Sequence, residues 1–367
     1  VGFPLLELVH KKGFPVNGFD LDEEKVKHAI NTGYSAYVNP EDVIKDMDCF
    51  IICVPTPVDT SHQPDLSKVK AASETISGFL RKDALVILES TVSPGTVEEI
   101  VIPVLEKSGL KAGNDFFLPH CPERINPDNK QWNVKTIPQI VGGLDKISTE
   151  LSFELYNTIL ESKVLKLSSL KNVEATKIVE NTFRDINIAF VNELARTFDK
   201  IGIDVEEVIN AAATKPFGFL PHCPGCGVGE HFIAVDPYYL IEKAETKGFN
   251  YSFLKLSRQI NNDMPHYTVI KTTKALNQIK KSVRGASIAI LGLSYKGGVE
   301  DTRESPAFPI IKELKELGAK ITIYDPYILN KSTVDSLDEA LKKNDCIVIV
   351  TNHPEFKKNK CRKTKRT

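Results

Sequence analysis

Short apolar runs of strand length punctuate the first half of the chain. They occur at residues 14–19, 49–54, 84–89, 115–118 and 139–141. Stretches that suit helices lie between them, such as residues 23–32 and 66–79. Because strands that alternate with helices form a parallel sheet covered by those helices, this half is predicted to be Rossmann-like.

A single long helix is predicted over about residues 168–200. Good helix formers dominate this stretch, and apolar residues recur along it at helical spacing. The apolar positions are Val173, Ile178, Val179, Phe183, Ile186, Phe190, Leu194 and Phe198. Such a helix commonly bridges domains.

A second αβ pattern follows, with strands predicted at residues 287–291 and 320–324 and a helix after Pro306. Tyr324-Asp325 ends the later strand just as Phe19-Asp20 ends an earlier one, in both cases after a glycine turn and a helix. This repeat predicts an α/β protein with two Rossmann-like lobes joined by a long central helix and a helical middle domain. We expect domains at residues 1–165, 166–280 and 281–367.

Composition narrows the class of protein. The chain has 367 residues, of which 41% are hydrophobic, so it can build more than one core. Its net charge of -1 creates no overall field for nucleic acid or an anionic membrane. No apolar run reaches the roughly 20 residues of a spanning helix, and residues 1–9 do not resemble a signal peptide. The seven cysteines suggest no disulfide framework, so we expect a cytoplasmic protein with reduced thiols.

The most informative stretch is a glycine-rich loop at residues 224–237, Pro-Gly-Cys-Gly-Val-Gly-Glu-His-Phe-Ile-Ala-Val-Asp-Pro. Gly225, Gly227 and Gly229 let the backbone approach a ligand more closely than other residues permit. The loop resembles the catalytic loop of the nucleotide-sugar 6-dehydrogenases, the UDP-glucose/GDP-mannose dehydrogenase family. Within that family it is most similar to the branch acting on UDP-N-acetylhexosamines, UDP-N-acetyl-D-mannosamine in particular. The resemblance spans essentially the whole chain and implies NAD-dependent oxidation of the sugar's C6 alcohol to a carboxylate, for polysaccharide or glycan biosynthesis.

The first lobe is implied to bind NAD. Gly2 would be the last glycine of a dinucleotide fingerprint, and Asp20, about one βαβ unit later, suits the adenosine ribose. Without the other motifs, these two residues would be read as a turn glycine and a strand-end aspartate. Pro55 and Thr56 end a strand at the edge where α/β proteins bind ligands, and they match a segment of the family.

The segment at residues 89–96, Glu-Ser-Thr-Val-Ser-Pro-Gly-Thr, ends the next strand. The resemblance implies that Thr91 lies near the nicotinamide and the substrate. Gly95 and Thr96 open a helix whose free amides could meet a phosphate.

The resemblance also implies a catalytic set. Glu123 would handle the water that hydrolyses an acyl intermediate, although with Arg124 it could equally be a solvated ion pair. Lys177 and Asn181 are four residues apart on the long helix and therefore share a face, where they would stabilise an oxyanion at C6 rather than being a neutral surface pair. Asp236 would aid proton transfer.

The second lobe is implied to bind the UDP group, and the long helix to carry a homodimer contact. The cations Lys296 and Arg303 suit a diphosphate. The implied substrate-binding residues are Arg124, Gly227, Gly229, His231, Arg258, Lys296 and Arg303.

Phe232 stands where this family has its nucleophilic cysteine. In the family a thiolate adds to the aldehyde left by the first oxidation, and the second oxidation gives a thioester that water cleaves. Phenylalanine can do none of this. The chain is therefore an impaired relative, another thiol such as Cys226 or Cys223 substitutes, or the codon is altered. The alternative function is a catalytically silent subunit that binds a nucleotide sugar.

A zinc site is an alternative interpretation of this loop, because His222, Cys223, Cys226 and His231 are residue types that bind zinc. The spacing lacks a second pair and the glycines match a substrate loop, so we expect no metal. Both ends look cut by comparison with the family. The first strand is expected to be missing before Gly2, and the basic run at residues 357–367 stands where another strand and helix are expected.

Overall fold

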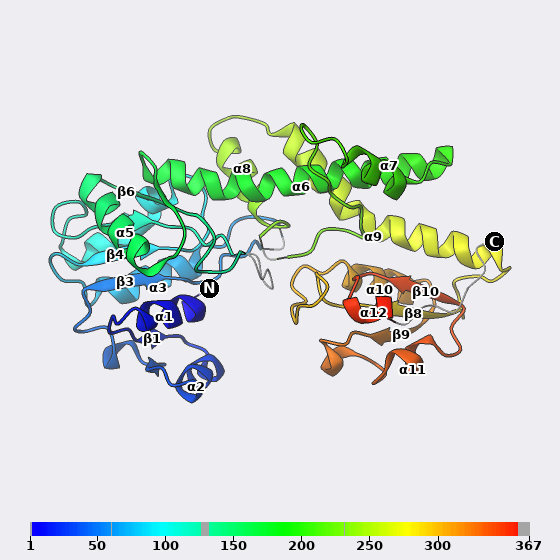
Figure 1. Ribbon diagram of the computed structural model, residues 1–367, viewed down its shortest axis with the longest axis horizontal. Helices are drawn as coiled ribbons and strands as arrows, with labels where there is room; N and C mark the ends of the chain where they lie inside the picture. Colours follow the sequence, from blue (N-terminus) through cyan, green and yellow to red (C-terminus); the bar gives the residue numbers. More distant parts are fainter. Residues whose placement is uncertain (1, 60, 126–131, 231, 359–367) are drawn as a thin grey trace. The chain divides into compact units, whose positions relative to one another are not determined.

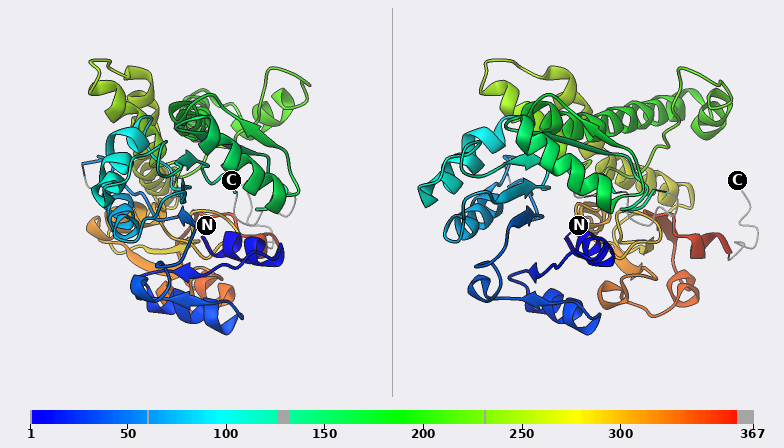
Figure 2. Two further views of the ribbon diagram at one scale, coloured as in Figure 1. Left: turned by 90° about the vertical axis from the view of Figure 1, so that its left-hand side faces the viewer. Right: turned by 60° about the vertical axis from the view of Figure 1, so that its left-hand side comes forward.

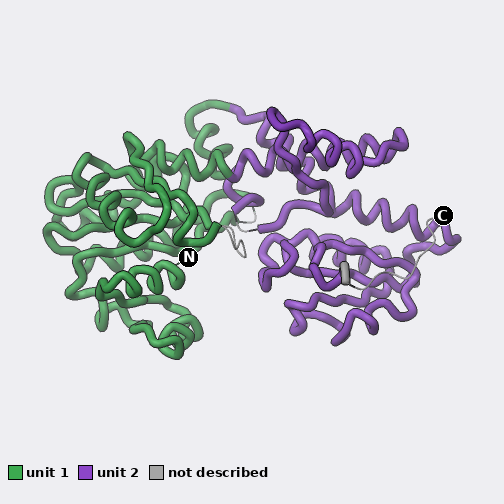
Figure 3. The backbone as a smooth tube through the Cα atoms, viewed as in Figure 1, with its two compact units in different colours: residues 1–180, 238–249 green, residues 181–237, 250–367 purple. Residues whose placement is uncertain are grey.

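The structure is a computed structural model, and it describes residues 2–59, 61–125, 132–230 and 232–358. The chain forms two compact units, shown in Figure 3. Unit 1 comprises Val1–Glu180 and Tyr238–Phe249, and unit 2 comprises Asn181–Pro237 and Asn250–Thr367. The predicted α/β class is confirmed. In the described part of the chain, no helix is long and apolar enough to cross a membrane.

Unit 1 contains a five-stranded sheet in the order β3-β4-β5-β6-β7 and a separate two-stranded sheet, β1-β2 (Figure 1). The strands are β1 (Gly18–Phe19), β2 (Ala36–Tyr37), β3 (Cys49–Ile52), β4 (Leu85–Leu88), β5 (Pro119–His120), β6 (Gln139–Gly143) and β7 (Val164–Lys166). The prediction of a wholly parallel sheet was wrong in one place, since β5 and β6 pair antiparallel.

Helices cover both faces of this sheet. They are α1 (Gly2–Lys11), α3 (Ser67–Ser77), α4 (Ile102–Leu105) and α5 (Lys146–Ile159), with a π-helical stretch at Val97–Val101, whereas α2 (Glu23–Asn31) packs on β1 and β2. One apolar core joins α3 and α4 to the sheet, and another joins α1 and α5 to it. Figure 2 shows the light-blue α3 and the green α5 on opposite sides of the strands. Alternation of helix and strand along the chain therefore produces the layered unit that the sequence predicts.

Two predicted strands differ from the observed ones by more than two residues at an end. Within residues 14–19 only Gly18 and Phe19 pair with another strand. The chain turns at Gly13, and Pro15 has no N–H to donate, so the start of this stretch does not join a sheet. Residues 115–118 are apolar and buried, but they make only isolated bridges and β5 begins at Pro119.

Helix α6 (Leu170–Ile201) begins in unit 1 and ends in unit 2, close to the predicted bounds. It is followed by α7 (Val205–Ala212), α8 (Asp236–Glu245) and α9 (Ser252–Gln278). In unit 2, Arg258 of α9 donates to the buried carboxylate of Asp185 on α6 at 2.5 Å. This buried ion pair fixes α9 against α6, and removing either partner would leave an uncompensated charge.

The rest of unit 2 is a three-stranded parallel sheet in the order β10-β8-β9. Its elements are β8 (Ser287–Leu291), α10 (Ala307–Glu316), β9 (Lys320–Tyr324), α11 (Leu337–Leu341), β10 (Cys346–Ile349) and α12 (Pro354–Lys358). Apolar side chains of α9 and α10 pack on the sheet. The predicted strands at 287–291 and 320–324 match β8 and β9 residue for residue. We call this sheet and its helices the C-terminal lobe.

Candidate active site

The carboxyl ends of β3 and β4 in unit 1 bring two predicted segments together. The Ser90 hydroxyl donates to the Val54 carbonyl at 2.7 Å, which ties residues 89–91 to residues 53–57. Tyr239 of α8 donates to the Thr56 carbonyl at 3.0 Å. Thr56 is buried by this packing, whereas Pro55 is exposed. The edge is therefore rigid where a ligand would meet it.

Thr91 is buried, and its hydroxyl oxygen has no hydrogen-bond partner in the described residues. A buried hydroxyl without a partner costs free energy unless a ligand completes it. Gly2 begins α1, and Asp20 lies at the end of β1 with a side chain that is 44% exposed. Asp20 accepts hydrogen bonds from the Asp22 amide at 3.0 Å and from the exposed Lys25 ammonium at 3.5 Å, and a partly exposed carboxylate at this strand end suits a ribose. These residues fit a dinucleotide cofactor.

The predicted phosphate site at Gly95 and Thr96 was wrong. The amides of Gly95 and Val97 instead donate to the carboxylate of Glu174 on α6, at 2.5 and 2.9 Å. Burial raises the pKa of Glu174 to about 7, although those two hydrogen bonds oppose the shift. The helix start is thus capped from within the protein. Local sequence patterns cannot indicate this contact, because the partners are 77 and 79 residues apart.

Glu123 and Arg124 follow β5 and have different environments. Glu123 is buried and accepts a hydrogen bond from the Ile125 amide. Burial raises its pKa, and the charge of Lys177 opposes the rise. Arg124 donates to both carboxylate oxygens of Glu180 and, at 2.6 Å, to the Pro138 carbonyl. Its guanidinium is therefore already hydrogen-bonded to α6 and to the neighbouring loop.

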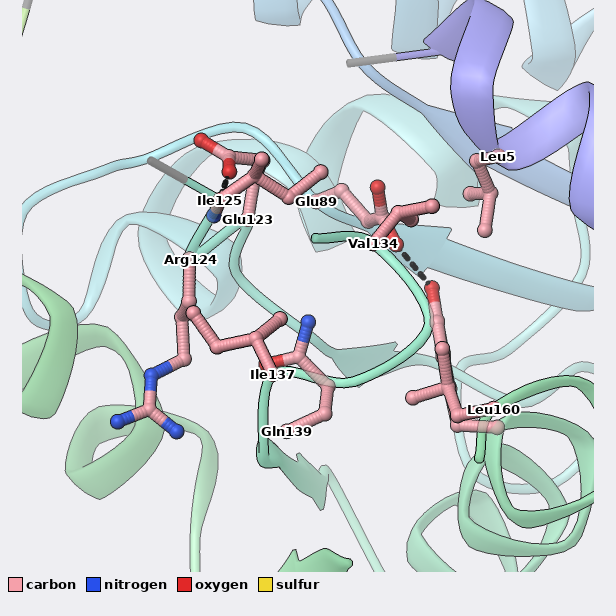
Figure 4. A pocket seen from close by; sticks show the side chains of 10 residues that line it. Leu5, Glu89, Glu123, Arg124, Ile125, Val134, Ile137, Gln139 and Leu160 are labelled. Atoms are coloured by element: carbon pink, nitrogen blue, oxygen red, sulfur yellow. Dashed lines mark hydrogen bonds between the residues drawn. The ribbon is translucent and has the colours of Figure 1, made fainter. Parts of the chain in front are cut away.

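A small pocket of unit 1 contains a carboxyl group that the sequence analysis missed (Figure 4). Glu89 accepts a hydrogen bond from the Tyr156 hydroxyl and lies 3.4 Å from the Cys53 sulfur. Burial raises the pKa of Glu89 to about 7. Its position directly after an apolar strand was the available signal. The pocket is lined by Leu5, Glu89, Glu123, Arg124, Ile125, Val134, Ile137, Gln139, Tyr156 and Leu160.

Unit 2 joins two predicted catalytic residues that are 55 positions apart. The amide nitrogen of Asn181 on α6 donates to the carboxylate of Asp236 at 2.5 Å, and both side chains are buried. Phe232 is half-buried, and its carbonyl accepts from the Asp236 amide at 2.7 Å. The backbone at Phe232 thus forms the turn that leads into α8. Lys177 is buried and lies one turn before Asn181 on α6.

Two of the three glycines of the loop, Gly227 and Gly229, lie closely against other parts of the protein. A Cβ atom on Gly229 would lie 2.6 Å from the Cβ of Tyr295 in the C-terminal lobe. Gly227 has φ of +142°, and a Cβ there would lie 2.9 Å from Pro306. Only glycine fits at both positions. His231 lies outside the described residues.

The remaining residues that were predicted to bind the substrate differ in burial and in the contacts they make within the protein. Arg258 is buried in the ion pair with Asp185, so the contact it makes is between helices. Arg303 is exposed, and its guanidinium donates to Asp301. Lys296 is half-buried on the segment after β8.

The six cysteines in the described part of the chain are free thiols. Burial raises the pKa of Cys226, whose sulfur lies 3.9 Å from the Ile349 carbonyl within the C-terminal lobe. A thiol with a raised pKa stays protonated and is a poor nucleophile. Among the described residues, no group of three or more His, Cys, Asp or Glu side chains could hold a metal ion.

The fold and site together define a nucleotide-binding α/β oxidoreductase. Models of the UDP-glucose/GDP-mannose dehydrogenase family match the chain in three parts: its NAD binding domain at residues 6–160, its central domain at 171–263 and its UDP binding domain at 289–367. The chain belongs to this family, and it is accordingly a nucleotide-sugar 6-dehydrogenase homologue with NAD as its cofactor.

Relatives of known activity lie within the UDP-N-acetylhexosamine branch. The UDP-N-acetyl-D-glucosamine 6-dehydrogenase of Pseudomonas aeruginosa is 38% identical over 97% of this chain and 89% of its own length. The UDP-N-acetyl-D-mannosamine dehydrogenase of Pyrococcus horikoshii is 34% identical over 97% of this chain and 88% of its own. The solved structure of UDP-D-ManNAc dehydrogenase from P. horikoshii has a TM-score of 0.91 at 34% identity, covering 97% of this chain and 88% of that one.

Proposed function

We propose that this chain oxidises the C6 alcohol of a UDP-N-acetylhexosamine, with UDP-N-acetyl-D-mannosamine as the first candidate. The observation that carries the proposal is the buried hydrogen bond between Asn181 and Asp236. It joins α6 to the glycine-rich loop, so an amide and a carboxylate meet beside the position of Phe232. The names of the relatives support the class of sugar, and a uronate product would suit polysaccharide or glycan biosynthesis.

The residues of the first lobe would hold the cofactor. Asp20 follows β1, Pro55 and Thr56 follow β3, and Gly2 begins α1, and strand ends and helix starts of this kind bind dinucleotides in Rossmann folds. The incomplete hydrogen bonding of Thr91 supports its place beside the nicotinamide. NAD supplies the hydride acceptor when it is bound.

The other residues act on the sugar. Lys177 and Asn181 would stabilise the oxyanion at C6, a role typically worth about 3 to 4 kcal/mol per donor. Asp236 would accept the proton of the alcohol, and the raised pKa of Glu123 suits a group that transfers protons to and from water.

The second oxidation is the step that Phe232 impairs. The aldehyde from the first oxidation has no further hydroxyl to oxidise until a nucleophile or water adds to it. Cys226 is an unsuitable substitute, because its half-buried thiol packs against the core of the C-terminal lobe and its pKa is raised. We therefore expect at most one NADH for each sugar consumed.

The test is the yield of NADH and acid from UDP-N-acetyl-D-mannosamine with the unaltered chain, F232C and F232A. We expect F232C to give two NADH for each sugar and to raise acid formation at least about a hundredfold, because it restores a nucleophile. F232A is the matched control, since it removes the ring without supplying a thiol, and it should form no acid. Absence of NADH with F232C on any UDP-hexosamine would reject the proposed function, and two NADH from the unaltered chain would reject the impairment.

A silent subunit that binds a nucleotide sugar is the second candidate, and Phe232 is the observation that favours it. It predicts UDP-sugar binding in calorimetry with no NADH from the unaltered chain. A single turnover of the unaltered chain that yields aldehyde and NADH would exclude it.

We further infer a homodimer that acts in the cytoplasm. Exposed apolar side chains on α6 support the first inference, because contiguous apolar surface is typical of interfaces. Free thiols support the second, because reducing compartments keep cysteines unpaired.

A further inference from the structure

An aspartate and a histidine form a buried pair in the C-terminal lobe. Asp325 follows β9 and His353 lies after β10, and neither side chain is exposed to solvent. Nε2 of His353 lies 3.1 Å from Oδ2 of Asp325. Neither residue belongs to the catalytic or cofactor-binding set, so their burial has another cause.

The Asp325 carboxylate is occupied by the start of the segment after β8. Its Oδ2 accepts from the Leu293 amide at 2.6 Å, the Ser294 amide at 2.8 Å and the Ser294 hydroxyl at 3.0 Å. Burial favours a raised pKa for Asp325, but the hydrogen bonds from His353, Ser294 and Leu293 outweigh it and hold the pKa below its usual value. An ionised carboxylate with this many donors binds the segment strongly.

The His353 ring reaches the other end of the same segment. The Gly298 amide donates to Nδ1 at 3.1 Å. Because a backbone N–H can only donate, Nδ1 carries no proton and Nε2–H donates to Asp325. The rings of Tyr327 and Phe356 lie 5.1 and 5.3 Å from the imidazole, centroid to centroid, and fix its orientation.

Close backbone contacts hold residues 292–298 against residues 351–353. A Cβ atom on Gly292 would lie 2.5 Å from the Cβ of Thr351, and one on Gly297 would lie 2.4 Å from the Asn352 carbonyl oxygen. Thr351 also donates its hydroxyl to the Ser294 carbonyl. The segment is thus pinned at both ends.

This segment supports the glycine-rich loop and carries Lys296. Gly229 packs on Tyr295 with no room for a Cβ atom. The Asp20 carboxylate, at the corresponding strand end of unit 1, is instead exposed. The aspartate at this strand end is therefore accessible to a ligand in unit 1, whereas in the C-terminal lobe it is buried and hydrogen-bonded to other residues of the lobe.

We propose that Asp325 and His353 are positioning residues that fix residues 292–298 for binding of a nucleoside diphosphate by the C-terminal lobe. The inference rests on the proposed function, since it takes the UDP part of the sugar nucleotide as the ligand. Phe232 does not affect it, because binding requires no nucleophile.

The test is calorimetric titration of the full chain with UDP and, separately, with NAD. We expect H353F to weaken UDP binding at least about tenfold, because small displacements of binding groups are costly, and to leave NAD binding unchanged. H353Q can place an amide N–H toward Asp325 and should recover part of the UDP affinity. The matched control is T333V, which removes a hydroxyl that accepts from the Ile323 amide of β9 at 2.8 Å and donates to the Ile323 carbonyl at 3.3 Å, outside residues 292–298.

Equal UDP affinity in H353F and the unaltered chain would overturn the proposal, as would equal losses in H353F and T333V. If H353F does not fold, H353Q is compared with T333V under the same criteria. If the unaltered chain binds no UDP, the proposed substrate fails. The positioning role is then decided by hydrogen exchange, which H353F or H353Q should accelerate at the Leu293 and Ser294 amides and which unchanged rates would contradict.

Discussion

Glu89 is a carboxyl group held away from water at the end of β4. Its pKa of about 7 lies above the value of 4.5 that is normal for glutamate, because burial disfavours the charged form. The Tyr156 and Cys53 hydrogen bonds oppose this shift without cancelling it. The folded protein therefore binds a proton at Glu89 that the unfolded chain releases between about pH 4.5 and 7.

We predict that E89Q changes the dependence of stability on pH. The stability contributed by protonated Glu89 is present below the unfolded pKa and is lost as pH rises through about 7. E89Q cannot ionise, so its free energy of unfolding should improve relative to the unaltered chain by about 2 to 3 kcal/mol between pH 5 and pH 8. Urea unfolding at both pH values measures this difference.

The Y156F variant is the control for that measurement, because it removes a hydrogen bond to Glu89 and leaves the carboxyl group able to titrate. Its stability should still fall between pH 5 and pH 8. Parallel stability curves for E89Q and the unaltered chain would show that Glu89 is already ionised in the folded protein at pH 5.

At the scale of elements, α6 contributes more than a connection between the units. Its Glu174 caps the helix start at residues 95–97, which places a charge-assisted contact between segments distant in sequence. The backbone there cannot offer its amides to a phosphate. The amides of this helix start bind the Glu174 carboxylate instead, and this contact stabilises the fold of unit 1.

We predict that E174Q destabilises unit 1 by about 1 to 3 kcal/mol, because glutamine has one acceptor oxygen for two amides and leaves one buried N–H unsatisfied. The matched control is E98Q, which removes a surface ion pair with Lys171 and should cost at most about 1 kcal/mol. Urea unfolding measures both variants, and amide exchange at Gly95 and Val97 should accelerate only in E174Q. Equal losses in the two variants would refute the capping role.

Elements with strong local patterns were predictable from sequence. α6, β8 and β9 have clear apolar periodicity and bounds set by nearby glycine or polar residues. Residues 115–118 show where prediction from apolar patterns fails. These residues are apolar because they are buried in an irregular segment, and the start of β5 depends on hydrogen bonding that the pattern does not reveal. Antiparallel pairing of β5 with β6 depends on chain path and leaves no local signature.

The residues of the candidate site were named from sequence motifs and stay predictions, and the sequence did not predict their contacts. The glycine-rich loop and the Lys177, Asn181 pair follow from motifs, and their catalytic roles stay predictions. Pairings such as Asn181 with Asp236 and Glu89 with Tyr156 span 55 and 67 residues. Only the folded chain brings such partners together, which is why Glu89, Glu174 and the Asp325, His353 pair were missed.

At the scale of the whole molecule, an exposed apolar face of α6 is a candidate surface for forming a dimer. Phe183 and Phe190 are 48% and 53% exposed, and Ile186 lies between them on the same helical face. Spacings of three and four residues place all three in one stripe. Large aromatic side chains left in water along one stripe favour a second copy of the chain as the covering surface.

We predict that the double substitution F183S and F190S converts a dimer to a monomer. Each phenylalanine buried at an interface contributes about 1.5 to 3 kcal/mol, and a twofold dimer contains each side chain twice, so the dissociation constant should rise at least about a thousandfold. Sedimentation over a range of concentrations measures it. The control is F308S, which removes a phenylalanine of similar exposure from α10 and should leave the dimer intact. A chain that sediments as a monomer before any substitution would refute the assembly, while a dimer that survives the double substitution would move the interface away from this stripe.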